Sequence, residues 1–278
     1  LFITNGIHKD EFFDLQLRLA RLRKKRLEQP EGIAFSESQK LVPELLVSLP
    51  FELTAAQRRV GAEIYADMQS PQIMNRLVQG DVGSGKTLVG LGAILMAVEN
   101  GYQAALMAPT EILAEQHYIN IKTLVEPLGL TAVFLKGKQR KALRRELLTV
   151  IESGVAHIVV GTHALIQEDV HFARLGLAVV DEQHRFGVVQ RGAFYKKGEK
   201  PDLLVMTATP IPRTLALTLY GELEVSVIDE LPPGRQPIRT ALRAPDRRDA
   251  IFEFAGDQAR QGRQVYVVYP LIEESEKM

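Results

Sequence analysis

Between residues 75 and 230, short apolar segments alternate with longer stretches that have the composition of helices. Most of the apolar segments are hydrophobic at every position, as is typical of parallel strands that helices cover on both faces. The candidate strands are 76–79, 104–108, 131–135, 158–161, 177–181, 203–207 and 225–228. The candidate helices between them include 86–100, 111–126, 140–153 and 211–219. This alternation predicts an α/β fold with a doubly wound, mainly parallel sheet.

The loop between the first strand and the helix after it has the spacing G-x-x-x-x-G-K-T. Its residues are Gly80, Asp81, Val82, Gly83, Ser84, Gly85, Lys86 and Thr87. Glycines let the backbone wrap around phosphate oxygens, and the helix N-terminus adds partial positive charge. The loop predicts a nucleoside triphosphate site in which Lys86 reaches the β- and γ-phosphates and the Thr87 hydroxyl binds Mg²⁺. The alternative is a glycine-rich turn, and the flanking strand and helix weigh against it.

Two acidic residues, Asp181 and Glu182, end the apolar run 177–180. The carboxyl end of a strand in such a sheet faces the ligand crevice. We expect Asp181 to hold Mg²⁺ and Glu182 to orient and deprotonate the attacking water as a general base. A solvated acidic turn is the alternative. Together with the P-loop, this pair predicts a magnesium-dependent triphosphatase whose catalytic residues are Lys86, Asp181 and Glu182.

The string Asp181-Glu-Gln-His-Arg-Phe-Gly-Val188 resembles the DExH motif of superfamily 2 helicases. It is most similar to the RecG family, bacterial ATP-dependent helicases that remodel branched DNA. The resemblance extends over residues 50–278 through four further motifs. They are the Q motif at 50–57, motif Ia at 108–117, motif Ib at 160–165 and motif III at 207–214.

Three alternatives to this family stay open. The motor of the transcription–repair coupling translocases is similar, but it typically carries Glu where this chain has Gln183. A small-molecule P-loop kinase or ATPase is disfavoured by Gln57 and by the string Thr207-Ala-Thr209. A module that holds ATP only as a structural ligand is the third.

The resemblance implies roles for residues that match the family's motifs. ATP and Mg²⁺ are the implied cofactors, with Phe51 and Gln57 at the adenine. His184, Thr207 and Thr209 would couple the nucleotide site to the DNA surface. The residues expected beside the DNA backbone are Pro109, Thr110, Gly137, Thr162 and His163.

Simpler roles exist for several of these residues. Thr110 could cap the helix that follows it, and Thr207 could satisfy a backbone group at the end of its strand. His184 could be a core histidine, and Gln57 an ordinary exposed helix residue.

The resemblance also implies a domain organisation. A helical connector at 1–49, including a helix over 8–29, precedes a RecA-like P-loop NTPase domain at 50–230. Residues 231–278 form a Pro- and Gly-rich linker and the beginning of a second RecA-like domain, with strands at 238–242 and 265–269 and a helix at 247–261. We expect the oligonucleotide-binding domain and the rest of the second motor domain to be missing. Its arginine finger contributes a factor of about a thousand or more, so this chain alone should hydrolyse ATP slowly.

Composition limits the partners and location. The 34 Lys and Arg balance the 34 Asp and Glu, which counts mildly against a large nucleic-acid footprint. Basic clusters at 21–26 and 136–145 are usually solvated helix faces, but the second follows Gly137 closely enough to flank DNA. Cysteine and membrane-length apolar runs are absent from the sequence. With the resemblance, these features predict a cytoplasmic, nucleoid-associated bacterial monomer that acts on branched double-stranded DNA such as stalled forks and Holliday junctions.

Overall fold

The computed structural model describes residue 17 and residues 32–181, 194–195, 197–198, 200–209, 223–232 and 240–269. The chain divides into two compact units, Leu1–Pro233 and Gly234–Met278. None of the helices in the described ranges is both long enough and apolar enough to cross a membrane.

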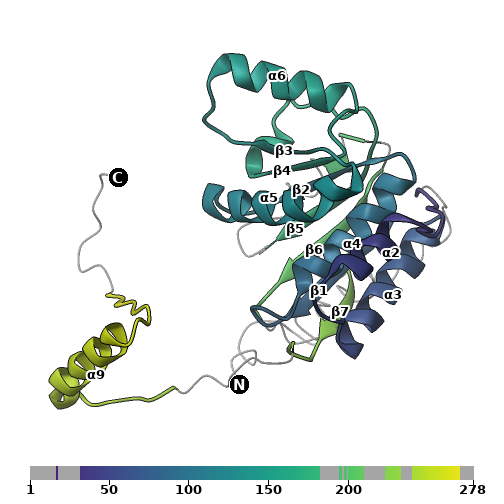
Figure 1. Cartoon of the computed structure of the whole chain (residues 1–278). Helices are drawn as coiled ribbons and strands as arrows, with labels where there is room; N and C mark the ends of the chain where they lie inside the picture. The colour runs from purple at the N-terminus through teal and green to yellow at the C-terminus, as the bar shows by residue number, and fades with distance from the viewer. Residues whose placement is uncertain are drawn as a thin grey trace. The chain divides into compact units, whose positions relative to one another are not determined.

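The larger unit is built on a sheet of seven parallel strands in the order β3-β4-β2-β5-β6-β1-β7 (Figure 1). The strands are β1 (Asn75–Gly80), β2 (Gln103–Met107), β3 (Ala132–Leu135), β4 (Ile158–Gly161), β5 (Leu175–Asp181), β6 (Asp202–Thr207) and β7 (Glu224–Ile228). Each coincides, within two residues at either end, with a segment predicted from the sequence. The α/β, RecA-like fold with a parallel sheet is therefore confirmed.

Five helices of the larger unit are described, of which the first two precede β1 and the other three connect strands. They are α2 (Leu41–Ser48), α3 (Ala55–Gln69), α4 (Lys86–Glu99), α5 (Glu111–Val125) and α6 (Lys141–Glu152). Short 3₁₀ turns lie at Glu126–Leu128 and His163–Ile166. The predicted helices at 86–100, 111–126 and 140–153 are confirmed. Those at 8–29 and 211–219 lie outside the described residues, apart from Leu17.

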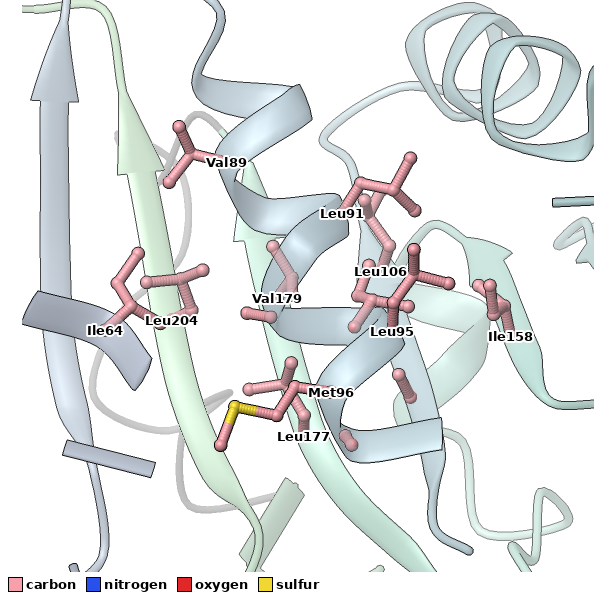
Figure 2. Packing of buried hydrophobic residues seen from close by; sticks show 14 of the residues in the cluster. Ile64, Val89, Leu91, Leu95, Met96, Leu106, Ile158, Leu177, Val179 and Leu204 are labelled. Carbon is pink, nitrogen blue, oxygen red and sulfur yellow. The ribbon is translucent and has the colours of Figure 1, made fainter. Parts of the chain in front are cut away.

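The core lies on both faces of the sheet because successive strand residues point to opposite sides. Leu106 and Val179 belong to one cluster, together with α2, α3, α4 and α5. Ala105 and Val180 belong to the other, which Ile151 of α6 joins. Figure 2 shows the first cluster, in which side chains of α4 meet those of the strands. Two covered faces explain why the strands are apolar throughout.

Glu99, the last residue of α4, forms hydrogen bonds with residues 38–41, which precede α3. The Glu99 carboxylate accepts hydrogen bonds from the Ser38 hydroxyl and from the N–H groups of residues 39–41 at the start of α2. Partial burial is the largest influence on the pKa of Glu99 and raises it, but these donors outweigh burial and leave the pKa lowered. Phe35 and Leu45 join the core of the larger unit. The predicted boundary at residue 49 stays a prediction, although residues 32–48 pack with the sheet's helices.

A buried carboxyl stands at the start of β6. Asp202 is 0% exposed, and its Oδ1 accepts a hydrogen bond from the Met74 N–H at 2.7 Å. Its Oδ2 has no partner among the described residues. Burial raises the pKa of Asp202 well above its ordinary value of 3.8; the Met74 N–H opposes this rise and the charge of Asp67 adds to it. Burial therefore favours the protonated form of Asp202 more strongly in the native chain than in the unfolded chain.

Replacing Asp202 by Asn should stabilise the folded chain at neutral and alkaline pH. Because the native carboxyl binds its proton more tightly than the unfolded chain does, stability is greatest below the unfolded pKa and falls as pH rises toward the folded pKa. Asn keeps an acceptor for Met74 and has no charge to bury. We expect a gain of about 1 kcal/mol or more at pH 8, measured by urea unfolding at pH 5 and pH 8. If the free energy of unfolding depended on pH equally in the parent and in Asp202→Asn, the raised pKa assigned to Asp202 would be contradicted.

The smaller unit contains one predicted helix without its predicted strands. Helix α9 (Arg248–Arg260) follows a 3₁₀ turn at Pro245–Arg247, which confirms the helix expected at 247–261. The strand predicted at 265–269 is wrong, because these residues have no regular secondary structure. Residues 240–242 likewise form no strand, and 238–239 lie outside the described part. A strand requires a neighbour for its backbone groups, and the described residues of this unit supply none.

Candidate nucleotide site and nucleic-acid interface

The predicted nucleotide residues gather at the carboxyl edge of three adjacent strands. The P-loop follows β1, Asp181 ends β5, and Thr207 ends β6. These strands are neighbours in the order β5-β6-β1, and their pairing sets Asp181 beside Met206 and Thr207 beside Gln79. Segments about a hundred residues apart in sequence thereby meet at one edge, where such sheets bind ligands.

The P-loop wraps around the side chain of Lys86. The buried ammonium donates hydrogen bonds to the carbonyl oxygens of Gly80 at 2.7 Å and Asp81 at 3.1 Å. Gly83 and Gly85 have φ of 79° and 86°, a left-handed conformation that favours glycine. A Cβ on Gly80 would lie 2.6 Å from the Ser84 Oγ. The loop can therefore close this tightly only with these glycines.

The P-loop has features that fit a phosphate group. The Ser84 Oγ is buried and has no hydrogen-bond partner among the described residues. Gly85 forms the N-terminal cap of α4 without a side-chain capping hydrogen bond, and the N-terminus of a helix carries partial positive charge. A phosphate oxygen could accept a hydrogen bond from the Ser84 hydroxyl and would be attracted by this charge.

Gln57 connects α3 to the P-loop. Its Oε1 accepts from the Thr54 N–H at 2.9 Å, which completes a capping box at the start of α3, and its Nε2 donates to the Ser84 carbonyl at 2.8 Å. A Cβ on Gly85 would come within 2.3 Å of this Nε2. Gln57 is 3% exposed, so it is not an ordinary surface residue. One N–H and one lone pair of its amide form no hydrogen bond with the described residues and could contact a base.

A surface pocket with a volume of about 440 Å³ adjoins the start of α3. It is lined by Leu46, Leu49, Pro50, Phe51, Glu52, Leu53 and Arg58. Its volume lies in the range of small-molecule sites. The Phe51 ring is half exposed, and both an aromatic ring and a guanidinium can stack on a purine. The surroundings of Phe51 therefore suit the contact with adenine that the sequence predicts for this residue.

The predicted metal ligands fit Mg²⁺. Asp181 is mostly buried at the end of β5, and Thr87 lies in the first turn of α4. The described ranges hold no group of three or more acidic or histidine side chains that could bind a metal. Mg²⁺ typically needs only one or two protein ligands, with phosphate oxygens and water completing its octahedron. Glu182 and His184 lie outside the described residues.

One neighbour of Asp181 was not predicted from the sequence. The Nε2 of His117, on α5, lies 2.7 Å from the Asp181 Oδ2. His117 stands within the motif Ia string, but spacing gave no sign that it would reach a strand 64 residues away.

The predicted DNA residues gather on the adjacent half of the same edge. Pro109 and Thr110 follow β2, Gly137 follows β3, and Thr162 and His163 follow β4, and these strands are neighbours in the order β3-β4-β2. A Cβ on Gly137 would lie 4.0 Å from the His163 Nε2. The Thr162 Oγ1 is buried and has no partner among the described residues. Backbone amides and small hydroxyls of this kind suit phosphate contacts.

Two of the threonines also fill the simpler roles. The Thr110 Oγ1 caps α5 by accepting from the Leu113 N–H at 3.3 Å. The Thr207 Oγ1 accepts from the Thr209 N–H at 3.1 Å. Neither contact prevents a second interaction, because a hydroxyl has two lone pairs and a proton to donate.

The basic cluster at 136–145 separates into two groups. Arg144 donates to both carboxylate oxygens of Asp169 at 2.9–3.0 Å and to Gln167, and Lys136 pairs with Glu115. These two cations are engaged within the fold. The remaining cations are exposed and have no ion pair within the described ranges: Lys138, Arg140, Lys141 and Arg145.

Comparisons with known proteins agree with this geometry. Residues 54–218 match the DEAD/DEAH box helicase family. The chain is 54% identical over 269 residues to the ATP-dependent DNA helicase RecG of Synechocystis sp., covering 97% of this chain and 32% of the relative. The RecG of Bacillus subtilis is 51% identical, with 97% and 39% covered.

A solved structure of RecG bound to a three-way DNA junction aligns with a TM-score of 0.82 and 45% identity. The alignment covers 95% of this chain and 35% of that one. The chain spans about a third of the length of the relatives it matches.

Proposed function

The chain belongs to the DEAD/DEAH box helicase family, in which it corresponds to the motor region of RecG, and we propose that it couples Mg-ATP hydrolysis to movement along double-stranded DNA. The observation that carries the proposal is the division of one sheet edge into two halves. Strands β1, β6 and β5 present the P-loop and Asp181, and strands β2, β4 and β3 present the hydroxyls and glycine suited to a phosphate backbone. One rigid sheet thus joins the two sites.

The hydrolytic roles are supported by the positions of Lys86 and Asp181 and, for Glu182, by the sequence motif alone. Lys86 and the N–H groups of the P-loop bind the phosphates, and the Thr87 hydroxyl and the Asp181 carboxylate hold Mg²⁺. When bound, the metal neutralises charge that develops on the phosphate oxygens. Glu182 orients the attacking water and accepts its proton. Gln57 and Phe51 hold the adenine beside α3.

The DNA is contacted without reading its sequence. Thr110, Gly137, Thr162 and His163 contact the sugar–phosphate backbone, as does the segment at Pro109. A relative was solved on a three-way DNA junction, which supports branched DNA, such as forks and Holliday junctions, as the substrate. The chain divides into its two units between residues 233 and 234, which supports residues 231–237 as the linker between a motor domain at 50–230 and a second one, with a connector at 1–49. The proposed location of this activity is the bacterial cytoplasm, at the nucleoid.

The exposed cations beside Gly137 should contribute to DNA affinity, whereas Arg144 should contribute to stability. Lys141→Ala should weaken binding to all sequences equally and reduce the slope of log affinity against log salt by about 1. Arg144→Ala should instead lower the free energy of unfolding, because it removes a bidentate pair with Asp169. Fluorescence anisotropy of labelled three-way junction DNA between 50 and 200 mM salt measures the slope. An unchanged slope for Lys141→Ala would remove this patch from the interface.

The proposed function is tested by nucleotide binding and turnover of the 278-residue chain, with Bacillus subtilis RecG measured in parallel. The chain should bind a fluorescent ATP analogue with Mg²⁺ but hydrolyse ATP about a thousandfold more slowly than that relative in the presence of junction DNA, because it covers 39% of the relative and an arginine supplied by a second domain can raise turnover by about 10³ or more. Absence of ATP binding would refute the nucleotide site. Strong DNA-stimulated hydrolysis by the chain alone would refute the need for a second domain.

A further inference from the structure

His117 on α5 makes a buried contact with the proposed metal ligand. Its Nε2 lies 2.7 Å from the Asp181 Oδ2, and the two side chains are 11% and 12% exposed. Surface ion pairs contribute little because water and salt screen them. This contact is shielded from both, so it can fix the orientation of the two groups.

The chemistry of the contact assigns its direction. A carboxylate that binds a metal only accepts hydrogen bonds, so in the proposed metal site the His117 Nε2 would be the donor to Asp181. This leaves the Asp181 Oδ1 and the remaining lone pair of the Oδ2 for the metal or its water. Carboxylates that bind metals are commonly held by such outer partners, which set the angle of the carboxylate plane.

The position of His117 on its helix adds a second link. Helix α5 begins after Thr110, whose hydroxyl caps it, and His117 lies seven residues further on, about 10 Å along the helix axis. The same helix thus starts at a proposed DNA contact and ends its second turn at the proposed metal carboxylate.

We propose that His117 is a positioning residue that holds the Asp181 carboxylate in the orientation needed to bind Mg-ATP, and that it ties this carboxylate to α5. The proposal rests on the assignment of Asp181 to the metal site.

The test measures binding of a fluorescent ATP analogue to the 278-residue chain across a range of Mg²⁺ concentrations and in EDTA. His117→Leu should need about ten to a hundred times more Mg²⁺ for half-maximal binding, while its affinity in EDTA stays unchanged. His117→Gln places an amide N–H near the same position and should retain nearly parental Mg²⁺ dependence. The exposed His171→Leu is the matched control and should behave as the parent.

The outcomes separate this inference from the proposed function. If Asp181→Asn binds Mg-ATP as the parent does, the metal assignment itself fails. Suppose that Mg²⁺ no longer strengthens binding of the ATP analogue to Asp181→Asn, but strengthens its binding to His117→Leu as it does in the parent. The metal assignment then stands, and the role of His117 is refuted. If His117→Leu also loses affinity in EDTA or melts early, His117→Gln decides. Restored Mg²⁺ dependence in His117→Gln upholds the proposal, and failure to restore it overturns the proposal.

Discussion

Replacing Lys86 by alanine is expected to remove ATP binding and to reduce hydrolysis at least about a hundredfold. The ammonium is buried in the loop and donates to two of the loop's own carbonyl oxygens. It is therefore held in place before any phosphate arrives, which lowers the cost of ordering it on binding. Alanine removes both the charge that meets the β- and γ-phosphates and the contacts that hold the loop closed. Titration with a fluorescent ATP analogue measures the affinity, and phosphate release measures turnover.

The control for this variant is Lys122→Ala, which removes a partly exposed lysine that pairs with Glu126 one helical turn away and lies over the Tyr118 ring. It should bind and hydrolyse ATP as the parent does. Thermal melting of Lys86→Ala separates a local defect from loss of the fold, because α4 is a central core helix. ATP affinity in a folded Lys86→Ala variant that equals the parental value would show that the P-loop is not the nucleotide site.

The sheet of the larger unit could be predicted because its strands carry a strong local signal. Segments such as 158–161 and 177–180 are apolar at every position, as is typical of a short strand that is covered on both faces. The order of the strands could not be read in this way. It depends on which faces meet after folding, and it places β5 and β6 between β2 and β1.

The smaller unit marks where local signals fail. Residues 265–269 are rich in Val and Tyr, which favour strands, but a strand also needs a partner for its N–H and C=O groups. Val268 and Phe254 remain largely exposed. Propensity alone therefore predicted a strand that the described residues of this unit do not support.

Motif spacing predicted the P-loop and Asp181, but not the contacts that join distant motifs. Gln57 reaches Ser84 across 27 residues, and His117 reaches Asp181 across 64. Arg144 was grouped with its basic neighbours because charge along a sequence carries no information about a partner such as Asp169. These contacts form between elements that only the folded sheet brings together.

Replacing Glu182 by glutamine is expected to leave ATP binding intact and to reduce hydrolysis by about 10² to 10⁴. Glu182 follows directly on Asp181 and lies outside the described residues, so its role depends on the sequence motif and the position of its neighbour. Glutamine keeps the shape of the side chain and can still hydrogen-bond water, but it cannot accept the proton. The measurement pairs ATP affinity with the rate of phosphate release in a single turnover. The exposed Glu168→Gln is the control.

The contrast between the two variants identifies the class of protein. A hydrolase should lose binding with Lys86→Ala and lose only turnover with Glu182→Gln, because phosphate binding and proton transfer belong to different residues. A module that merely holds ATP would respond to Lys86→Ala but would have no turnover for Glu182→Gln to change. If Glu182→Gln hydrolysed ATP at the parental rate, a residue other than Glu182 would be the general base. Asp181 and the P-loop would still form the nucleotide site.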